Sequence, residues 1–93
     1  MCGRVAGTTF AREVRGQPTY LNLDRPYPDQ PFAVVIWGDD RPLFGEPERR
    51  FAGRPVCATG IIRLHRGKPE IAVRRPEEIT TSGAGDPLPG GRP

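Results

Sequence analysis

Residues 54–75, RPVCATGIIRLHRGKPEIAVRR, decide the fold that the sequence predicts. Two alternating runs joined by a short link that contains Gly are typical of a β-hairpin, and here the link is Arg66-Gly67-Lys68. Gly60 interrupts the first run, and an isolated Gly within a strand usually marks a bulge or a sharp bend. We therefore expect a hairpin that curves.

The two-residue period of a strand divides this hairpin into two faces. The positions expected to face inward are Val56, Ala58, Gly60, Ile62, Leu64, Ile71 and Val73. The opposite face is more polar. Basic side chains gather at the ends of the hairpin, at Arg63, His65, Arg66, Lys68, Arg74 and Arg75.

Length and composition indicate one small domain built from short strands and turns. The chain has 93 residues, with 12 Gly, 12 Pro and only 35% hydrophobic residues, which disfavours a helical bundle. The net charge of +3 permits an anionic partner without requiring one. No apolar run approaches the ~18 residues of a membrane span, and no signal peptide is visible, so we expect a cytoplasmic protein that makes no membrane contact.

The other segments supply three more strands and a helical link. Strands are expected within residues 1–15, at Thr19–Leu23 and at 32–37, the last of which is apolar on both faces. Residues 46–51 are expected to be helical, because Pro47 suits the first helical position. We assign residues 1–80 to the domain and 81–93 to a disordered Gly/Pro-rich tail.

Three strands, a short helical link and two more strands follow the plan of the OB-fold. The predicted fold class is therefore all-β: a five-stranded, OB-fold-like antiparallel barrel with one short helix between strands 3 and 4. The chain from about Cys2 to Ile79 also resembles small bacterial OB-fold nucleic-acid-binding domains. The segments that carry the resemblance are CGRV (2–5), PTYLNL (18–23), FAVVIWG (32–38), VCATGII (56–62) and RGKPEI (66–71).

The hairpin is similar to the closing hairpin of anticodon-binding-like OB domains, which usually carry more of the first strand before Cys-Gly. The resemblance implies binding of single-stranded DNA or RNA without a cofactor. OB-folds bind oligonucleotides on the outer face of their second and third strands. The side chains expected there are Tyr20, Asn22, Val35 and Trp37.

Exposed aromatic rings on that face would stack with bases. Tyr20 and Trp37 are the candidates, and packing into the core remains the open alternative for both of them. The basic residues expected to contact phosphates lie in the first loop and around the hairpin. They are Arg12, Arg15, Arg63, Arg66, Lys68 and Arg74, with Arg75 beside them and acids interleaved at Glu13, Glu70, Glu77 and Glu78.

Two other functions are weighed against low-specificity nucleic-acid binding. A metal-assisted nuclease needs clustered carboxylates, and the only candidates are Asp39, Asp40, Glu46 and Glu48, whose spacing does not match that chemistry. With one His and two Cys, no metal site is expected. The rival class is a protein-interaction module that uses the same outer face, because fold alone does not fix function.

The two cysteines leave a choice between free thiols and a disulfide. Antiparallel pairing sets the start of one strand against the end of its partner, which separates Cys57 from Cys2 unless the first strand bends strongly at Gly7. A reducing compartment also keeps thiols free. We therefore expect free thiols, with a Cys2–Cys57 bridge as the alternative.

Overall fold

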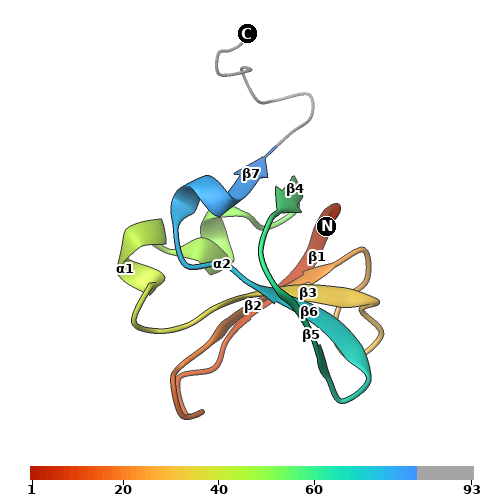
Figure 1. Cartoon of the computed structure of the whole chain (residues 1–93), viewed down its shortest axis with the longest axis horizontal. Coiled ribbons are helices and arrows are strands. Elements are labelled where there is room, and N and C mark those ends of the chain that lie inside the picture. Colours follow the sequence, from red (N-terminus) through yellow and green to blue (C-terminus); the bar gives the residue numbers. More distant parts are fainter. Residues whose placement is uncertain (82–93) are drawn as a thin grey trace, which may run out of the picture.

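The computed structural model describes residues 1–81 and is mostly β-structure (Figure 1). The strands are β1 (Cys2–Phe10), β2 (Thr19–Leu23), β3 (Phe32–Ile36), β4 (Pro55–Ala58), β5 (Ile62–His65), β6 (Lys68–Ala72) and β7 (Ile79–Thr81). The helices are α1 (Arg41–Phe44), α2 (Pro47–Arg50) and the 3-10 turn η1 (Pro76–Glu78). Of the expected tail, Thr81 ends β7 and residues 82–93 lie outside the described part.

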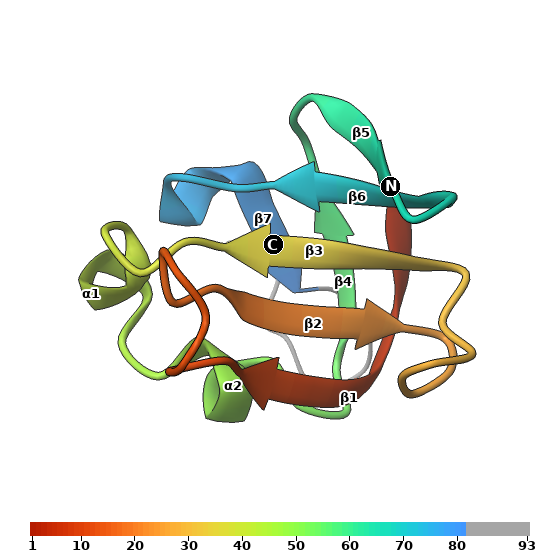
Figure 2. The ribbon, with the colours of Figure 1, turned by 90° about the horizontal axis from the view of Figure 1, so that it is seen from below.

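The strands form a single mixed sheet in the order β5-β6-β3-β2-β1-β4-β7. All neighbours are antiparallel except β3 and β6, which run parallel. Figure 2 shows β4 and β7 crossing behind β2 and β3, so the sheet folds over itself. The core lies inside this fold, and the opposite face of β2 and β3 is turned outward.

β4 and β5 are two halves of one chain path, separated only by Thr59-Gly60-Ile61. β4 pairs with β1, whereas β5 pairs with β6 at the other end of the strand order. A side chain at Gly60 would meet the carbonyl oxygen of Ala72 at 3.0 Å and Cγ2 of Ile71 at 3.1 Å, so the tight crossing favours Gly. Three linking residues span at most about 15 Å. The two edges of the sheet are therefore held close together.

The expected all-β class is confirmed, but the expected five-stranded antiparallel barrel is wrong. The structure has seven strands, one parallel pair and no ladder that joins β5 to β7 within residues 1–81. The extra strands arise because the first arm of the hairpin breaks at Gly60 and because residues after η1 add β7 to β4. The turn at Arg66-Gly67 is confirmed, with both residues at positive φ.

The expected helical link also differs in detail. Helical residues do lie between the third and fourth strands, but they form two helices of four residues each instead of one. Pro47 occupies the start of α2, as its fixed φ favours. Phe44 and Phe51 are buried at 1% and 2% exposure, so this link fills the core beneath the sheet.

The core follows the two-residue period of the central strands. Of the alternating residues expected to face inward on β2 and β3, Leu21, Leu23, Val34 and Ile36 are buried, whereas Phe32 is only half-buried. Val5, Val73 and Ile79 are also buried. The complete cluster comprises Val5, Leu21, Leu23, Val34, Ile36, Phe44, Phe51, Val56, Ala58, Ile71, Val73 and Ile79. The outward residues Ala33 and Val35 are also buried, so both faces of β3 are covered.

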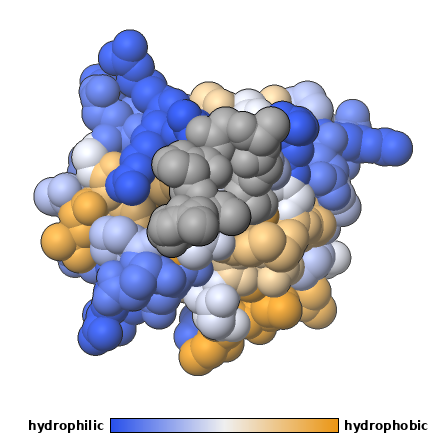
Figure 3. All heavy atoms as spheres, turned by 90° about the horizontal axis from the view of Figure 1, so that it is seen from above, coloured by the Kyte–Doolittle hydropathy of each residue, from blue (hydrophilic) through white to orange (hydrophobic). Residues whose placement is uncertain are grey.

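The inward assignment of the first hairpin arm fails after Gly60. Ile62 and Leu64 are 57% and 75% exposed, because the bend carries β5 beyond the covered part of the core. Ile61 is exposed to the same degree as Leu64. Figure 3 shows one face of the molecule, on which hydrophobic areas lie between projecting hydrophilic groups.

Cys2 and Cys57 form a disulfide with an Sγ–Sγ distance of 2.09 Å, so the expectation of free thiols is wrong. β4 pairs only with the first residues of β1, where Cys2 lies directly opposite Cys57. The register of β1 shifts between Val5 and Gly7, and its later residues pair with β2. The expected separation is absent because β4 reaches only residues 2–4 of β1, so Cys57 meets the beginning of that strand and not its far end.

Arg41 joins the two helices to the sheet. Its guanidinium donates to the Glu48 carboxylate at 2.6 and 2.8 Å and to Thr19 Oγ1 at 3.0 Å, and it stacks 3.7 Å from the centre of the Phe10 ring. The hydrogen bonds from Arg41 lower the pKa of Glu48, although burial acts in the opposite direction. Because this pKa is depressed in the folded protein, the pair stabilises the fold above the ordinary carboxylate pKa. That stability is lost as the pH falls below it.

The disulfide generates a prediction about stability. It links residues 55 positions apart, and closing such a loop restricts the unfolded chain. Reduction, or the double substitution Cys2→Ala/Cys57→Ala, should lower the free energy of unfolding by roughly 2–4 kcal/mol, measured by urea titration. Thiol titration of the unfolded, non-reduced chain should find no free thiol; two thiols per chain would contradict the bridge.

The Arg41–Glu48 pair generates a second prediction. Glu48→Gln should lower the free energy of unfolding at pH 7 by roughly 1–3 kcal/mol, because a charged hydrogen-bonded pair is broken. It should also flatten the loss of stability between about pH 5 and pH 3. Some of that loss will remain, since backbone N–H groups of Arg74 and Arg75 lower the pKa of Glu78 as well.

The matched control for this prediction is Glu46→Gln. Glu46 pairs with Arg49 at 3.5 Å, but both side chains are mostly exposed, so the change should cost less than about 0.5 kcal/mol. Equal losses for the two glutamates would show that the Arg41–Glu48 pair has no special role.

Candidate functional site

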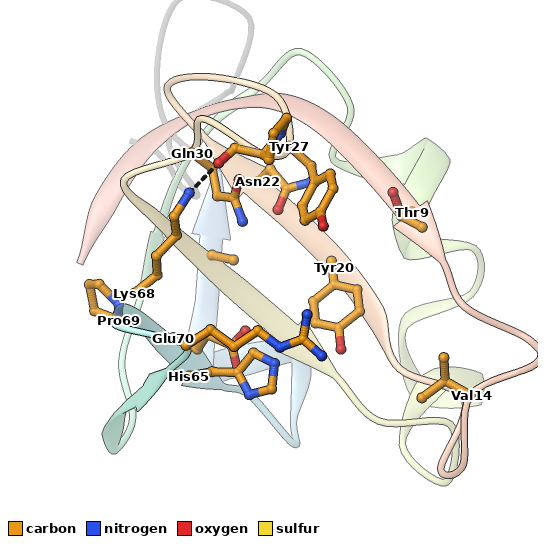
Figure 4. Close-up of a pocket in the computed structure, with 13 residues that line it drawn as sticks. Thr9, Val14, Tyr20, Asn22, Tyr27, Gln30, His65, Lys68, Pro69 and Glu70 are labelled. Carbon is orange, nitrogen blue, oxygen red and sulfur yellow. Dashed lines mark hydrogen bonds between the residues drawn. The ribbon is translucent and has the colours of Figure 1, made fainter.

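A groove of about 590 Å³ lies over the outer face of β1, β2 and β3 and is bounded by the hairpin of β5 and β6 (Figure 4). Its floor is formed by Thr9, Tyr20, Asn22 and Ala33. The loop between β2 and β3 supplies Tyr27, Pro28 and Gln30, and the loop after β1 supplies Val14. The hairpin supplies His65, Arg66, Lys68, Pro69 and Glu70.

The strand register explains how residues far apart in the sequence reach this floor. Side chains of directly paired residues share one face of a sheet. Asn22 pairs with Ala33, and Ala33 pairs with Glu70, so these three form a row across β2, β3 and β6. A second row begins with Thr9 opposite Tyr20. The floor is therefore built by backbone pairing alone.

The hairpin brings positive charge to one wall of the groove. The turn at Arg66-Gly67 places His65 opposite Lys68, so their side chains share a face. Lys68 Nζ donates to the Pro28 carbonyl oxygen, which ties the hairpin to the loop between β2 and β3. Figure 4 shows Lys68 reaching toward this loop, with His65 and Glu70 on the same side of the groove.

The other wall is aromatic and polar. Tyr27 is 70% exposed, so its ring is available to a ligand. Gln30 Oε1 is buried and has no hydrogen-bond partner among the described residues. A buried acceptor without a donor is unusual in proteins, and each case calls for an explanation.

Tyr20 experiences the mixed charge of the groove. Burial raises its pKa, the negative charge of Glu70 raises it further, and the positive charge of Arg66 acts in the opposite direction. The tyrosine ring therefore lies within electrostatic reach of both an anion and a cation. This arrangement can hold a ligand that combines a flat ring with negatively charged groups.

Four of the nine residues expected at the site line the groove: Tyr20, Asn22, Arg66 and Lys68. The other five do not line it. Trp37 is 42% exposed and lies against Gly16, and Arg12 lies 5.4 Å from the Phe10 ring. Arg74 is 3.9 Å from Asp40. Arg15 is exposed after β1, and Arg63 is exposed on β5 opposite Glu70.

Sequence reasoning missed several lining residues, chiefly Tyr27, Gln30 and Glu70. Tyr27 and Gln30 lie in an irregular loop rich in proline, where no periodicity indicates direction. Glu70 was counted only as an acid that weakens a basic patch. The alternation of the second hairpin arm was the available signal, because it places Glu70 on the face opposite the buried Ile71.

Two of the carboxylates considered for metal-assisted cleavage are paired with arginines in the structure. Of the carboxylates considered for metal-assisted cleavage, Glu48 is engaged by Arg41 and Glu46 by Arg49. Residues 1–81 contain no group of three or more His, Cys, Asp or Glu side chains placed to hold a metal ion. Across the same residues, no helix has the length and apolar character needed to span a membrane.

The chain was also compared with known proteins. It matches no protein-family model, no curated protein and no solved structure. The geometry of the groove is therefore the basis for a functional interpretation.

Proposed function

We propose that the protein binds single-stranded nucleic acid in the groove and does so without catalysis. The observation that carries this proposal is a tyrosine on the floor of an open groove beside a wall that bears Arg66 and Lys68. Bases stack on aromatic rings, and cations neutralise the phosphates of the backbone. A single strand offers both groups in alternation, whereas a duplex hides the faces of its bases.

The strand connections support a relationship to the OB-fold. β1 pairs with both β2 and β4, β3 runs parallel to β6, and the helices lie between β3 and β4. If β4 and β5 count as one strand bent at Gly60, the remaining order follows the five-strand plan of that fold. The groove then lies over the second and third strands, where OB-folds bind oligonucleotides.

The disulfide bears on where this binding takes place. Structural disulfides persist in oxidising compartments and are rare in the cytosol. Cys2 and Cys57 are therefore difficult to reconcile with the cytoplasmic location expected from the sequence. We propose that the protein acts on nucleic acid outside the reducing cytoplasm.

A protein-interaction module remains the second candidate, but a different surface favours it. Ile61, Ile62 and Leu64 are exposed on or beside β5, and within residues 1–81 β5 pairs with a strand on one side only. An open strand edge with apolar side chains is a typical docking surface for another chain. Binding there would depend little on salt, whereas binding of a nucleic acid strand in the groove would depend on it strongly.

The stacking contact generates a prediction for Tyr20. Tyr20→Ala should weaken binding of a ten-nucleotide single strand by roughly tenfold, and Tyr20→Phe should retain most of the affinity, because stacking needs only the ring. Trp37→Ala is the comparison, since Trp37 does not line the groove and its loss should change affinity less than about threefold. Fluorescence anisotropy measures all three, and a larger effect for Trp37 than for Tyr20 would place the binding surface elsewhere.

The charged wall generates a prediction for salt dependence. Each phosphate contact on a single strand adds about 0.7 to the slope of log affinity against log salt concentration. Arg66→Ala should reduce that slope by about this amount. Arg49→Ala, which removes an exposed cation on α2 outside the groove, should leave the slope unchanged. A binding constant that does not vary with salt would favour the protein-interaction module instead.

A further inference from the structure

Two hydrogen-bond acceptors in the groove have no donor among residues 1–81. Gln30 Oε1 is buried without a partner. The Glu70 carboxylate makes no hydrogen bond or ion pair within this part of the chain. Arg63 lies opposite it in the β5–β6 ladder, and Glu70 and Arg66 both lie within electrostatic reach of Tyr20. The Glu70 side chain is only half-buried, so water can reach its carboxylate. A ligand that displaces this water has to offer hydrogen-bond donors, because a carboxylate only accepts.

The row of residues across the floor of the groove determines the size of the group that can bind beside Glu70. Asn22, Ala33 and Glu70 follow one another across β2, β3 and β6 on the same face. The small Ala33 leaves a depression between its two polar neighbours. Because adjacent strands lie about 4.8 Å apart, the backbones of Asn22 and Glu70 are separated by roughly 10 Å, which is the scale of one flat base. Tyr20 lies two residues from Asn22 along β2 and faces the same depression.

We propose that this depression selects a guanine base within the bound strand, with Glu70 as the residue that determines specificity. The pairing edge of guanine carries a ring N–H and an exocyclic amino group side by side. A carboxylate accepts both at once, and such charge-assisted paired bonds are the strongest of their kind.

Thymine and uracil fit this site poorly. Their pairing edge carries a single N–H between two carbonyl oxygens, and those oxygens would face the carboxylate. Glu70 also repels the phosphates that Arg66 and Lys68 attract, so it weakens binding of every strand that does not satisfy it. Glu70 therefore weakens the binding of single strands in general, and the hydrogen bonds from guanine compensate for this repulsion. This inference rests on the proposed function, and it replaces the low sequence specificity expected from the sequence.

The test compares ten-nucleotide strands of thymidine with strands that carry one central guanine or one central hypoxanthine, as DNA and as the corresponding RNA. Hypoxanthine retains the ring N–H of guanine but lacks its amino group. The guanine strand should bind the wild-type protein roughly tenfold more tightly than the thymidine strand, and hypoxanthine should lose most of that gain. Anisotropy at one fixed salt concentration measures each affinity.

Glu70→Gln separates specificity from a structural role, because its two effects run in opposite directions. It should tighten binding of the thymidine strand, since a negative charge is removed, and should reduce the guanine preference to less than about threefold. Glu77→Gln removes the same charge from an exposed position on η1 outside the groove and should preserve the tenfold preference.

Each outcome decides between the two proposals. Equal affinity of the wild type for all three strands, or a guanine preference that survives Glu70→Gln, overturns the guanine site but leaves nucleic-acid binding intact. Failure to bind any strand of either sugar type overturns the proposed function itself.

Discussion

The crossing at Gly60 is the constraint on which the rest of the structure depends. The backbone of β6 passes so close to this position that a side chain would lie only 3.0 Å from the carbonyl oxygen of Ala72. Without the crossing, one chain path could not pair with β1 through β4 and with β6 through β5, toward opposite ends of the strand order. The curl of the sheet follows from this double pairing, and it creates an enclosed core on one side and an open floor on the other.

Much of the fold was predictable because it depends on local patterns. The alternation of Leu21 with Leu23, and of Val34 with Ile36, identified the buried face of both central strands, and Gly60 marked the bend. The path of the chain after the bend, and hence the exposure of β5, was not predictable. The apolar residues Ile62 and Leu64 continue the inward pattern in the sequence but lie beyond the core in space, because periodicity reports which face a residue occupies and not whether anything covers it.

The residues of the groove also divide into those that the sequence could predict and those that it could not. Tyr20 and Asn22 were predictable, since the strand period assigned them to the outward face of β2. Tyr27 and Gln30 were not, because they belong to a loop whose path is set by contacts with Lys68 on the distant hairpin. The disulfide was mispredicted for a related reason. β4 is short and pairs only with residues 2–4 of β1, and no pattern in the sequence indicates how little of the first strand β4 reaches.

The disulfide also distinguishes two parts of the groove: strands that lie within the covalently closed ring and a hairpin that lies outside it. The covalent ring from Cys2 to Cys57 contains β1, β2 and β3, and hence the whole floor, whereas the hairpin of β5 and β6 lies outside the ring. The bridge joins the start of β1 to β4 covalently, while the ladders among β1, β2 and β3 hold the floor itself together. The hairpin is held to the floor by the β3–β6 ladder and the Lys68 contact, both of which are non-covalent. A polymer can therefore enter from the side, at an internal position along its length, without a free end to thread.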